Sequence, residues 1–222
     1  DPERTLEQQN YGTEFFGDPL NENPGPNCTR IYIQNLNGLQ WDKEGGKWPY
    51  VCDTLDAIQA DVACFSEINV DTSQYKVRKK MESICQRQFN QNNLITSTSS
   101  YTTISPYKPG GTAILACNQI TANITSHTRD RMGRWSSICF TTASSKRLRI
   151  ISAYQVCHTT SIGTNTASSH QRAQIIEEAA NTSINHRPSP RQSFIQDLQA
   201  FITHIKAEGE YIILAGDFNE EI

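Results

Sequence analysis

Short apolar runs alternate with polar segments along the chain from Arg30 onward. Runs of about four to eight residues, rich in branched and aromatic side chains and bounded by turn residues, are typical of buried strands. These runs predict strands at residues 31–36, 61–68, 112–117, 135–140, 148–156 and 211–216.

Other segments carry apolar residues at helical spacing instead. The clearest stripe contains Phe194, Leu198 and Ile205 and predicts a helix that packs on a core. Asp71 is predicted to cap an earlier helix. We predict helices at residues 49–60, 72–89, 171–180 and 193–207, and loops at 123–134 and 158–169. Strands and helices in this order predict a layered α/β sandwich with sheets inside and helices outside.

The length of 222 residues suits one domain, since domains usually hold roughly 50 to 250 residues. Residues 1–29 are acidic, rich in Gly and Pro, and without a clear period, so we predict a poorly ordered leader there and a folded domain at 30–222. The chain starts at Asp1 rather than Met and stops at Ile222, and we interpret both ends as cuts in a longer protein. No run reaches the roughly 18 apolar residues that span a membrane, and no signal peptide is visible.

The net charge of −3 gives no nucleic-acid signal, but the distribution of charge is uneven. Residues 129–149 carry six bases and the single acid Asp130. Such a segment either faces a phosphate backbone or forms a solvated rim of a sheet, and the sequence leaves both readings open.

The seven cysteines include no CxxC pair, and several lie inside apolar runs. Buried free cysteine behaves as a small hydrophobe, and reduced thiols indicate an intracellular protein. We therefore expect a nuclear or cytoplasmic location, without secretion.

Polar side chains stand at the ends of several apolar runs, where α/β folds place active sites. These side chains belong to Asn35, Asn37, Glu67, Tyr154, Asp217 and Asn219. Glu67 is either an ordinary acid at a strand end or a ligand for a hard cation such as Mg²⁺, which prefers oxygen ligands.

Asp217 and Asn219 are two residues apart, so in extended chain both side chains point to the same face. One can then orient or deprotonate a water while the other donates to phosphate. Alternatively, the Asp-Phe-Asn segment after Gly216 forms only a turn.

The segments IYIQNLNGL, DVACFSEI, GGTAILA, ISAYQV and IILAGDFN occur in that order between residues 30 and 222. In this order they resemble the endonuclease/exonuclease/phosphatase superfamily, which includes deoxyribonuclease I-like nucleases, abasic-site endonucleases and the endonuclease domains of non-LTR retrotransposons. The resemblance implies a four-layer α/β/β/α sandwich with two packed mixed β-sheets flanked by helices, incomplete at the C-terminus.

The resemblance also implies roles for individual residues. Glu67 corresponds to the principal metal-binding Glu, and Asn35 to the Asn that helps orient the metal ligand and phosphate, so both are assigned to the metal site. Tyr154 corresponds to a phosphate-contacting Tyr, Asp217 to the Asp that orients or deprotonates water, and Asn219 to an Asn that binds phosphate. The implied cofactor is Mg²⁺, with Mn²⁺ as a substitute.

Three departures from the family pattern stand out. Asn37 replaces an Asp ligand of some members, and Cys157 replaces an Asn of abasic endonucleases. The family's last motif, an Asp-His pair, is not found before Ile222. No internal histidine replaces it, because all five are interpreted as surface residues: His127, His158, His170, His186 and His204.

The fragment alone is therefore expected to be inactive or nearly so, with an exposed sheet edge and a tendency to aggregate. A cooperative thermal melt of a soluble monomer would contradict that expectation. Continuation of the coding sequence beyond Ile222 into strands that end in an Asp-His pair would support the nuclease hypothesis, whereas a stop codon there would favour a non-catalytic role.

The leading hypothesis is a Mg²⁺-dependent DNA endonuclease domain of a retrotransposon-like polyprotein, with a reverse transcriptase downstream and no membrane partner. The segment from Gly133 to Trp135 resembles one found in retroelement domains. One alternative is a phosphatase or phosphodiesterase of the same superfamily that acts on a non-DNA phosphoester. Another is a non-catalytic remnant that acts only as a binding module.

Overall fold

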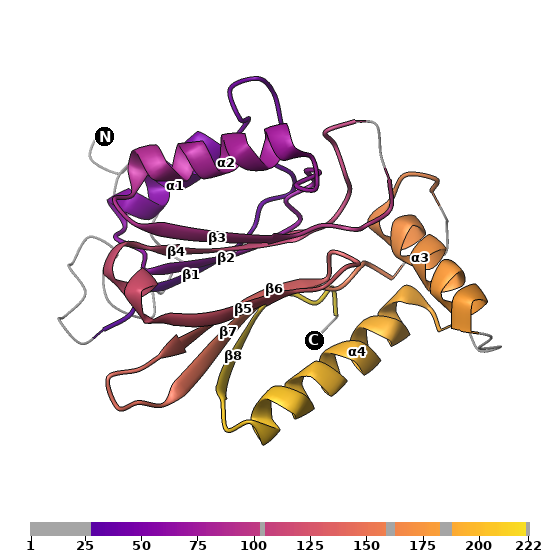
Figure 1. Cartoon of the computed structure of the whole chain (residues 1–222). Helices are drawn as coiled ribbons and strands as arrows, with labels where there is room; N and C mark the ends of the chain where they lie inside the picture. The colour runs from indigo at the N-terminus through magenta and orange to yellow at the C-terminus, as the bar shows by residue number, and fades with distance from the viewer. Residues whose placement is uncertain (1–27, 103–104, 159–162, 183–187, 221–222) are drawn as a thin grey trace, which may run out of the picture.

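The protein folds into two β-sheets that pack face to face, with helices on both outer faces (Figure 1). This four-layer α/β/β/α arrangement confirms the predicted fold class. The computed structural model describes residues 28–102, 105–158, 163–182 and 188–220. The predicted leader therefore lies outside the described residues, apart from its last two positions.

The first sheet has four strands in the order β1-β2-β4-β3. They are β1 (Ile31–Asn35), β2 (Val62–Ser66), β4 (Thr112–Cys117) and β3 (Asn92–Ser97). β1 pairs parallel with β2, and β4 pairs antiparallel with both β2 and β3. The carboxyl ends of β1, β2 and β3 consequently lie at the same end of this sheet.

The second sheet also has four strands, in the order β5-β6-β7-β8. They are β5 (Ile124–Arg129), β6 (Trp135–Thr141), β7 (Arg147–Tyr154) and β8 (Tyr211–Asp217). β6 pairs antiparallel with β5 and β7, and β7 pairs parallel with β8. The carboxyl ends of β5, β7 and β8 therefore also lie together.

The helices divide between the outer faces and one end of the sandwich (Figure 1). They are α1 (Trp48–Ala57), α2 (Tyr75–Gln88), the 3₁₀ helix η1 (Asn118–Asn123), α3 (Ala167–Thr182) and α4 (Pro190–Ala207). α1 and α2 cover the first sheet, and α4 covers the second. α3 contacts α4 and lies at the end of the sandwich where the loops after β3 and β7 emerge.

β2 is buried on both faces because it lies inside the first sheet, between the helices and the second sheet. Val62 and Cys64 pack between the sheets with Ile138, whereas Ala63 and Phe65 face α1 and α2. A strand covered on both sides reads as a continuous apolar run rather than an alternating one. This packing explains why the segment before Glu67 is so uniformly apolar.

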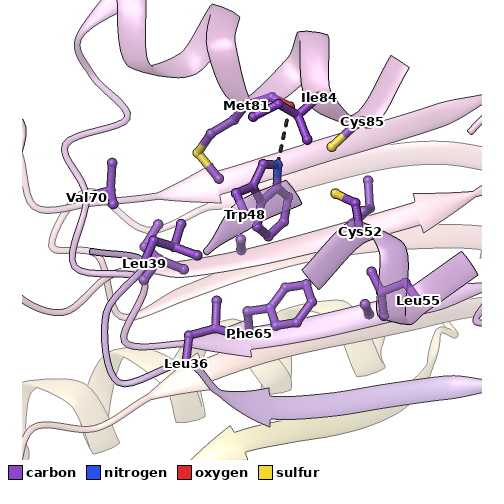
Figure 2. Close-up of a cluster of buried hydrophobic side chains, with 14 of the residues drawn as sticks. Leu36, Leu39, Trp48, Cys52, Leu55, Phe65, Val70, Met81, Ile84 and Cys85 are labelled. Atoms are coloured by element: carbon purple, nitrogen blue, oxygen red, sulfur yellow. Dashed lines mark hydrogen bonds between the residues drawn. The ribbon is translucent and has the colours of Figure 1, made fainter. Parts of the chain in front are cut away.

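Trp48 anchors the outer core between α1, α2 and the first sheet (Figure 2). Its indole is fully buried, its Nε1 donates to the carbonyl of Met81 at 3.3 Å, and its ring meets Phe65 edge-on at 5.6 Å. Cys52 and Cys85 lie beside it, where their contact and their burial raise the pKa of the Cys52 thiol far above its usual value. Thiols in such surroundings act as small hydrophobes and are chemically inert.

α4 begins with a capping box. The Ser189 side chain accepts from the backbone N–H of Gln192, whose side chain accepts from the backbone N–H of Ser189. The apolar face of α4 then packs on Trp135, which stacks on Phe201 at 5.9 Å and meets Phe194 at 6.3 Å. The predicted helix and its core-packing stripe are confirmed.

Several local predictions are wrong. β3 and β5 were not predicted, because β3 is largely polar and β5 is an edge strand inside the segment expected to be a loop. α2 is capped at Gln74 without a side-chain bond, while Asp71 forms a buried ion pair with Lys108 at 3.0 Å. α3 begins at Ala167, inside the predicted loop.

The expectation that every histidine lies on the surface is wrong for His170. This side chain is buried against Tyr101, with ring centroids 4.5 Å apart. Burial and the charge of Lys108 lower the pKa of His170, so it stays neutral near pH 7. His127 is exposed but lies in β5 rather than in a loop, and His186 lies outside the described residues.

Two edge strands of the sandwich carry exposed apolar side chains. β1 and β8 lie at the edges of their sheets, and the side chains of Ile33 and Leu214 are 53% and 39% exposed. Among the described residues, none of the helices combines the length and the apolar character that are needed to cross a membrane.

Candidate active site

The predicted site residues gather where the carboxyl ends of β1, β2, β7 and β8 meet. β1 and β2 belong to the first sheet and β7 and β8 to the second. The two sheets are linked there by a side-chain hydrogen bond, from Asn35 Nδ2 to Asp217 Oδ2 at 2.7 Å. Residues from four separate parts of the sequence thus form one polar site.

Asp217 is held in one orientation by hydrogen bonds to both carboxylate oxygens. Oδ2 accepts from Asn35, and Oδ1 accepts from the backbone N–H of Asn219 at 3.0 Å. Each oxygen of a carboxylate can accept more than one hydrogen bond, so both retain capacity to bind a water or a cation. The side chain is half-buried and can be reached by a ligand.

Asn35 is itself fixed by its own loop. Its Oδ1 accepts from the backbone N–H of Asn37 at 2.8 Å, while its Nδ2 is directed at Asp217. The residue is exposed, and Oδ1 keeps a second lone pair. Asn35 therefore positions Asp217 and still offers one oxygen to a cation.

Glu67 directly follows β2 and has a backbone φ of 50°. This left-handed conformation is uncommon for a residue other than Gly, Asn or Asp, and such strain collects at functional sites. The Glu67 carbonyl accepts from the backbone N–H of Gly38 at 2.8 Å, which holds the turn in place. The turn directs the carboxylate away from the continuing strand and toward Tyr154.

Tyr154 lies beside Asp217 in the parallel ladder between β7 and β8 and is 5% exposed. Burial, followed by the hydrogen bond with Glu67 and the charge of that carboxylate, raises the pKa of the Tyr154 hydroxyl above its ordinary value. The hydroxyl thus stays protonated over the physiological range and donates to Glu67. Tyr154 fixes the position of the carboxylate that the sequence assigns to metal binding.

Asn219 continues the site on the far side of Asp217. Its Nδ2 donates to the carbonyl of Gln155 at 2.7 Å, and its Oδ1 lies 3.1 Å from Cys157 Sγ. An amide nitrogen carries two hydrogens, so one N–H of Asn219 remains for a phosphate oxygen. Cys157, where abasic endonucleases often have Asn, thus contacts a predicted catalytic residue directly.

Two glycines allow the backbones of the site to approach each other. Gly216 has a φ of 149°, and a Cβ there would lie 1.9 Å from the carbonyl oxygen of Ala153. Gly110 has a φ of 78°, and a Cβ there would lie 3.3 Å from Tyr154 Cε1. Glycine is needed at both positions because no other residue tolerates the combination of this φ and this space.

Two supporting residues were missed by the sequence analysis. Asn69 Oδ1 accepts from the backbone N–H of Gly110 at 2.7 Å, and its own N–H donates back to the Gly110 carbonyl. Arg191 on α4 donates to the carbonyl of Val156 at 2.6 Å and forms an ion pair with Glu220. Asn69 directly follows the apolar run 61–68, so its position was a signal that could have found it, whereas Arg191 lies in a helix and follows no apolar run.

The donor set suits a cation that needs few protein ligands. Among the residues that the structure places, no three His, Cys, Asp or Glu side chains cluster as a complete metal cage. Mg²⁺ is usually bound through only one or two carboxylates, with waters and substrate phosphate completing the shell. Glu67 and Asp217, with the oxygen of Asn35, fit that requirement.

All five residues predicted for the site lie in this region, and none is displaced to another part of the fold: Asn35, Glu67, Tyr154, Asp217 and Asn219. Their individual chemical roles stay predictions. Asn37 is exposed and lies beside Asn35, to which its backbone N–H donates.

The chain matches the family model described as "Endonuclease/Exonuclease/phosphatase family" over residues 35–221. No curated protein matches it. Among solved structures, it is similar to the human Nocturnin catalytic domain, with 14% identity, 87% of this chain and 64% of that chain covered, and a TM-score of 0.49. It is also similar to the 3′ phosphatase NExo from Neisseria bound to product DNA hairpin, with 13% identity, coverages of 86% and 58%, and a TM-score of 0.48.

A third similar structure is humanized D. rerio TDP2, with 13% identity, coverages of 87% and 63%, and a TM-score of 0.47. The chain spans less than two thirds of the length of each of these three structures.

Proposed function

The chain belongs to the endonuclease/exonuclease/phosphatase family, and we propose that it forms the Mg²⁺-dependent endonuclease domain of a protein that hydrolyses DNA phosphodiesters. The observation that carries the proposal is the junction of the two sheets, where Asn35, Asp217 and Asn219 form a continuous hydrogen-bonded row. Glu67, held by Tyr154, stands beside that row.

Asp217 is the residue that orients and deprotonates the attacking water. Its two oxygens are fixed by Asn35 and Asn219, so a water bound to a remaining lone pair has a defined direction of attack. A positioned general base contributes typically about 10² to 10⁴ in rate. The remaining N–H of Asn219 donates to a phosphoryl oxygen and strengthens as charge develops there.

Glu67 would hold Mg²⁺, with Asn35 Oδ1 as a further oxygen ligand and Mn²⁺ as a possible substitute. When bound, the cation supplies Lewis-acid stabilisation of charge on the phosphoryl oxygens. Tyr154 contributes by donating to Glu67, which fixes one rotamer of the carboxylate and shields it from bulk water. Substitution of either residue should therefore weaken cation binding.

A DNA substrate is supported by the resemblance of the ordered motifs to a family that includes DNA nucleases. A retrotransposon-like polyprotein with a downstream reverse transcriptase is supported by the segment Gly133 to Trp135. The turn in this segment requires glycine, because Gly133 has a φ of 78° and a Cβ there would lie 2.8 Å from the backbone nitrogen of Ser99. Buried free cysteines support an intracellular location.

The proposal is tested by nicking of supercoiled plasmid with the complete natural protein that carries this chain. We expect nicking with Mg²⁺, none with a chelator, and a loss of at least about 10²-fold in Glu67→Gln and Asp217→Asn. Asp53→Asn on the exposed face of α1 is the matched control and should cleave normally.

Two other outcomes would replace the proposal. Cleavage of a phosphomonoester without plasmid nicking would identify a phosphatase or phosphodiesterase of the same family. The absence of any metal-dependent cleavage, combined with DNA binding, would identify a non-catalytic binding module.

A further inference from the structure

A polar groove runs along the edge of the sandwich where β3 of the first sheet lies beside β5 of the second. Its volume is about 390 Å³, and an adjoining hollow of about 170 Å³ shares Arg78, Thr96 and Arg129 with it. The hydroxyl side chains and Arg78 that line the groove come from β3, from α2 and from the segments that adjoin them, whereas Arg129 and Arg131 come from the end of β5 and the residues after it. This combination of donors suits an anionic ligand with many oxygens.

The alternation of β5 places its cations outward. Along β5 the exposed positions include His127 and Arg129, and Arg131 follows two residues later. Across the part of the chain that the structure describes, Arg129 has no acidic partner. Arg131 pairs with Glu178 at 3.0 Å, but both side chains are largely exposed, so this pair adds little stability and can be exchanged for a ligand.

Asp130, the acid that lines the groove, does not neutralise these cations, whereas Glu82 in the adjoining hollow pairs with Arg78 at 3.8 Å. Both oxygens of Asp130 accept from the guanidinium of Arg134, at 2.8 and 2.9 Å. Asp130 Oδ2 also accepts from the backbone N–H groups of Met132 and Arg134. The negative charge of Asp130 is therefore already matched inside the fold.

The remaining bases of the segment 129–149 are used structurally. Arg134 is buried between Asp130 and Asp197, and Arg149 is buried against Glu210. Arg147 also pairs with Glu210 and Lys146 lies over the ring of Tyr211. The basic segment thus divides into a buried ion-paired part and an exposed part at Arg129 and Arg131.

The groove lies at the same end of the sheets as the candidate active site. Ser97 ends β3 and donates to the carbonyl of Asp130, just after β5, as Asn35 at the end of β1 donates to Asp217 at the end of β8. β3 is two strands from β2 and three from β1, which corresponds to about 10 to 14 Å at a strand spacing of about 4.8 Å. That distance equals about three to four base-pair steps of duplex DNA.

We propose that this groove binds the phosphate backbone of a nucleic-acid substrate about three to four base pairs from the scissile phosphate. The inference rests on the proposed function for the identity of the substrate. Arg78, Arg129 and Arg131 supply the positive charge, and the hydroxyls of Thr96 and its neighbours supply further donors. Contacts of this kind position a duplex without reading its sequence.

The test is the salt dependence of binding of a labelled DNA duplex, followed by fluorescence anisotropy in the presence of a chelator. The double variant Arg78→Gln, Arg129→Gln removes the two cations shared by the groove and its adjoining hollow. The slope of log K against log salt is negative, and each lost phosphate contact reduces its magnitude by about 0.9, so we expect the magnitude to fall by about 1.8 and binding to weaken at every salt concentration.

The control is Arg87→Gln, Lys206→Gln, which removes the same charge. Both control residues are exposed in the last turns of α2 and α4, at the opposite end of the sheets from the active site. An unchanged slope in the control and a slope of smaller magnitude in the groove variant would support the proposal. Equal slopes in the two variants, or no duplex binding by the unmodified chain, would overturn it.

Poly-L-glutamate distinguishes nucleic acid from other polyanions. Competition by poly-L-glutamate as strong as that by unlabelled DNA would also overturn the assignment, because the groove would then recognise charge alone. Plasmid nicking separates this proposal from the catalytic one. If the salt dependence of binding changes in the groove variant but the natural protein never nicks plasmid, the binding proposal holds and the catalytic proposal fails.

Discussion

Asn35 donates a hydrogen bond of 2.7 Å to Asp217, a residue 182 positions later in the chain. The bond joins the end of β1 in one sheet to the end of β8 in the other, so it depends on the correct packing of the two sheets. The orientation of the proposed catalytic carboxylate is therefore a property of the whole sandwich.

Asn35→Ala should lower the turnover of the natural protein by about 10²-fold with little change in KM. Loss of the amide frees one oxygen of Asp217, and a misplacement of about 1 Å can cost about that much. Asn90→Ala, at an exposed turn before β3, is the control. Steady-state kinetics on a plasmid or oligonucleotide checks the prediction, and an unchanged turnover in Asn35→Ala would rule out the positioning role.

Glu67→Gln should abolish stabilisation of the fold by Mg²⁺. A cation at ten times its Kd stabilises the folded state by about 1.4 kcal/mol, because it binds the folded chain and not the unfolded one. Differential scanning fluorimetry with and without Mg²⁺ measures this shift in Tm. An equal shift in Glu67→Gln and in the unmodified chain would place the cation elsewhere.

Tyr154→Phe should change the stability of the protein at high pH. The pKa of Tyr154 is raised in the folded state by burial and by Glu67, so its contribution is fully present below about pH 10, the pKa of an unfolded tyrosine, and is lost as pH rises above it. Urea unfolding between pH 8 and about 11 should show a smaller loss of stability in Tyr154→Phe. Identical pH profiles would show that Tyr154 is not the buried titrating group.

Glu210→Gln should lower the free energy of unfolding by about 3 to 5 kcal/mol, because it leaves Arg149 buried without a negative partner. A hydrogen bond from Arg149 lowers the pKa of Glu210, so its contribution is present above the unfolded pKa of about 4.5 and is lost as pH falls below it. Glu208→Gln is the exposed control and should cost less than about 1 kcal/mol. Urea unfolding at pH 7 and pH 4 compares the two, and equal effects would contradict the buried pair.

Gly216→Ala should be far more costly than Gly209→Ala. Both residues have positive φ, but a Cβ on Gly216 would overlap the Ala153 carbonyl, whereas a Cβ on Gly209 meets nothing within 4 Å. The strain of a positive φ alone costs about 1 to 2 kcal/mol, and the overlap adds to it at Gly216. Thermal unfolding compares the variants, and similar losses would mean that β7 and β8 separate easily.

The sequence by itself determined the main elements of the site. A strand covered on both faces must be uniformly apolar, so Val62–Ser66 was visible as a strand and Glu67 as the polar residue at its end. Asp217 and Asn219 were likewise visible as polar residues after the last apolar run, but the expectation of extended chain between them is wrong. β8 ends at Asp217, and Asn219 has a φ of 48° in a turn closed by its backbone N–H bond to Asp217 Oδ1. The apolar run and the polar residue at its end depend on neighbouring positions in the sequence, so they can be read from the local pattern.

Tertiary structure alone decided which polar residues meet and which charges stay exposed. Asp71 was expected to cap a helix, but in the folded chain it forms an ion pair with the buried Lys108. Arg129 and Arg134 look alike in sequence, yet one faces solvent in a groove and the other is enclosed by two carboxylates. Asp130 is a near neighbour of Arg134, but Asp197 of α4 and the Lys108 partner of Asp71 come from distant parts of the chain, and no local pattern encodes contacts between residues so far apart.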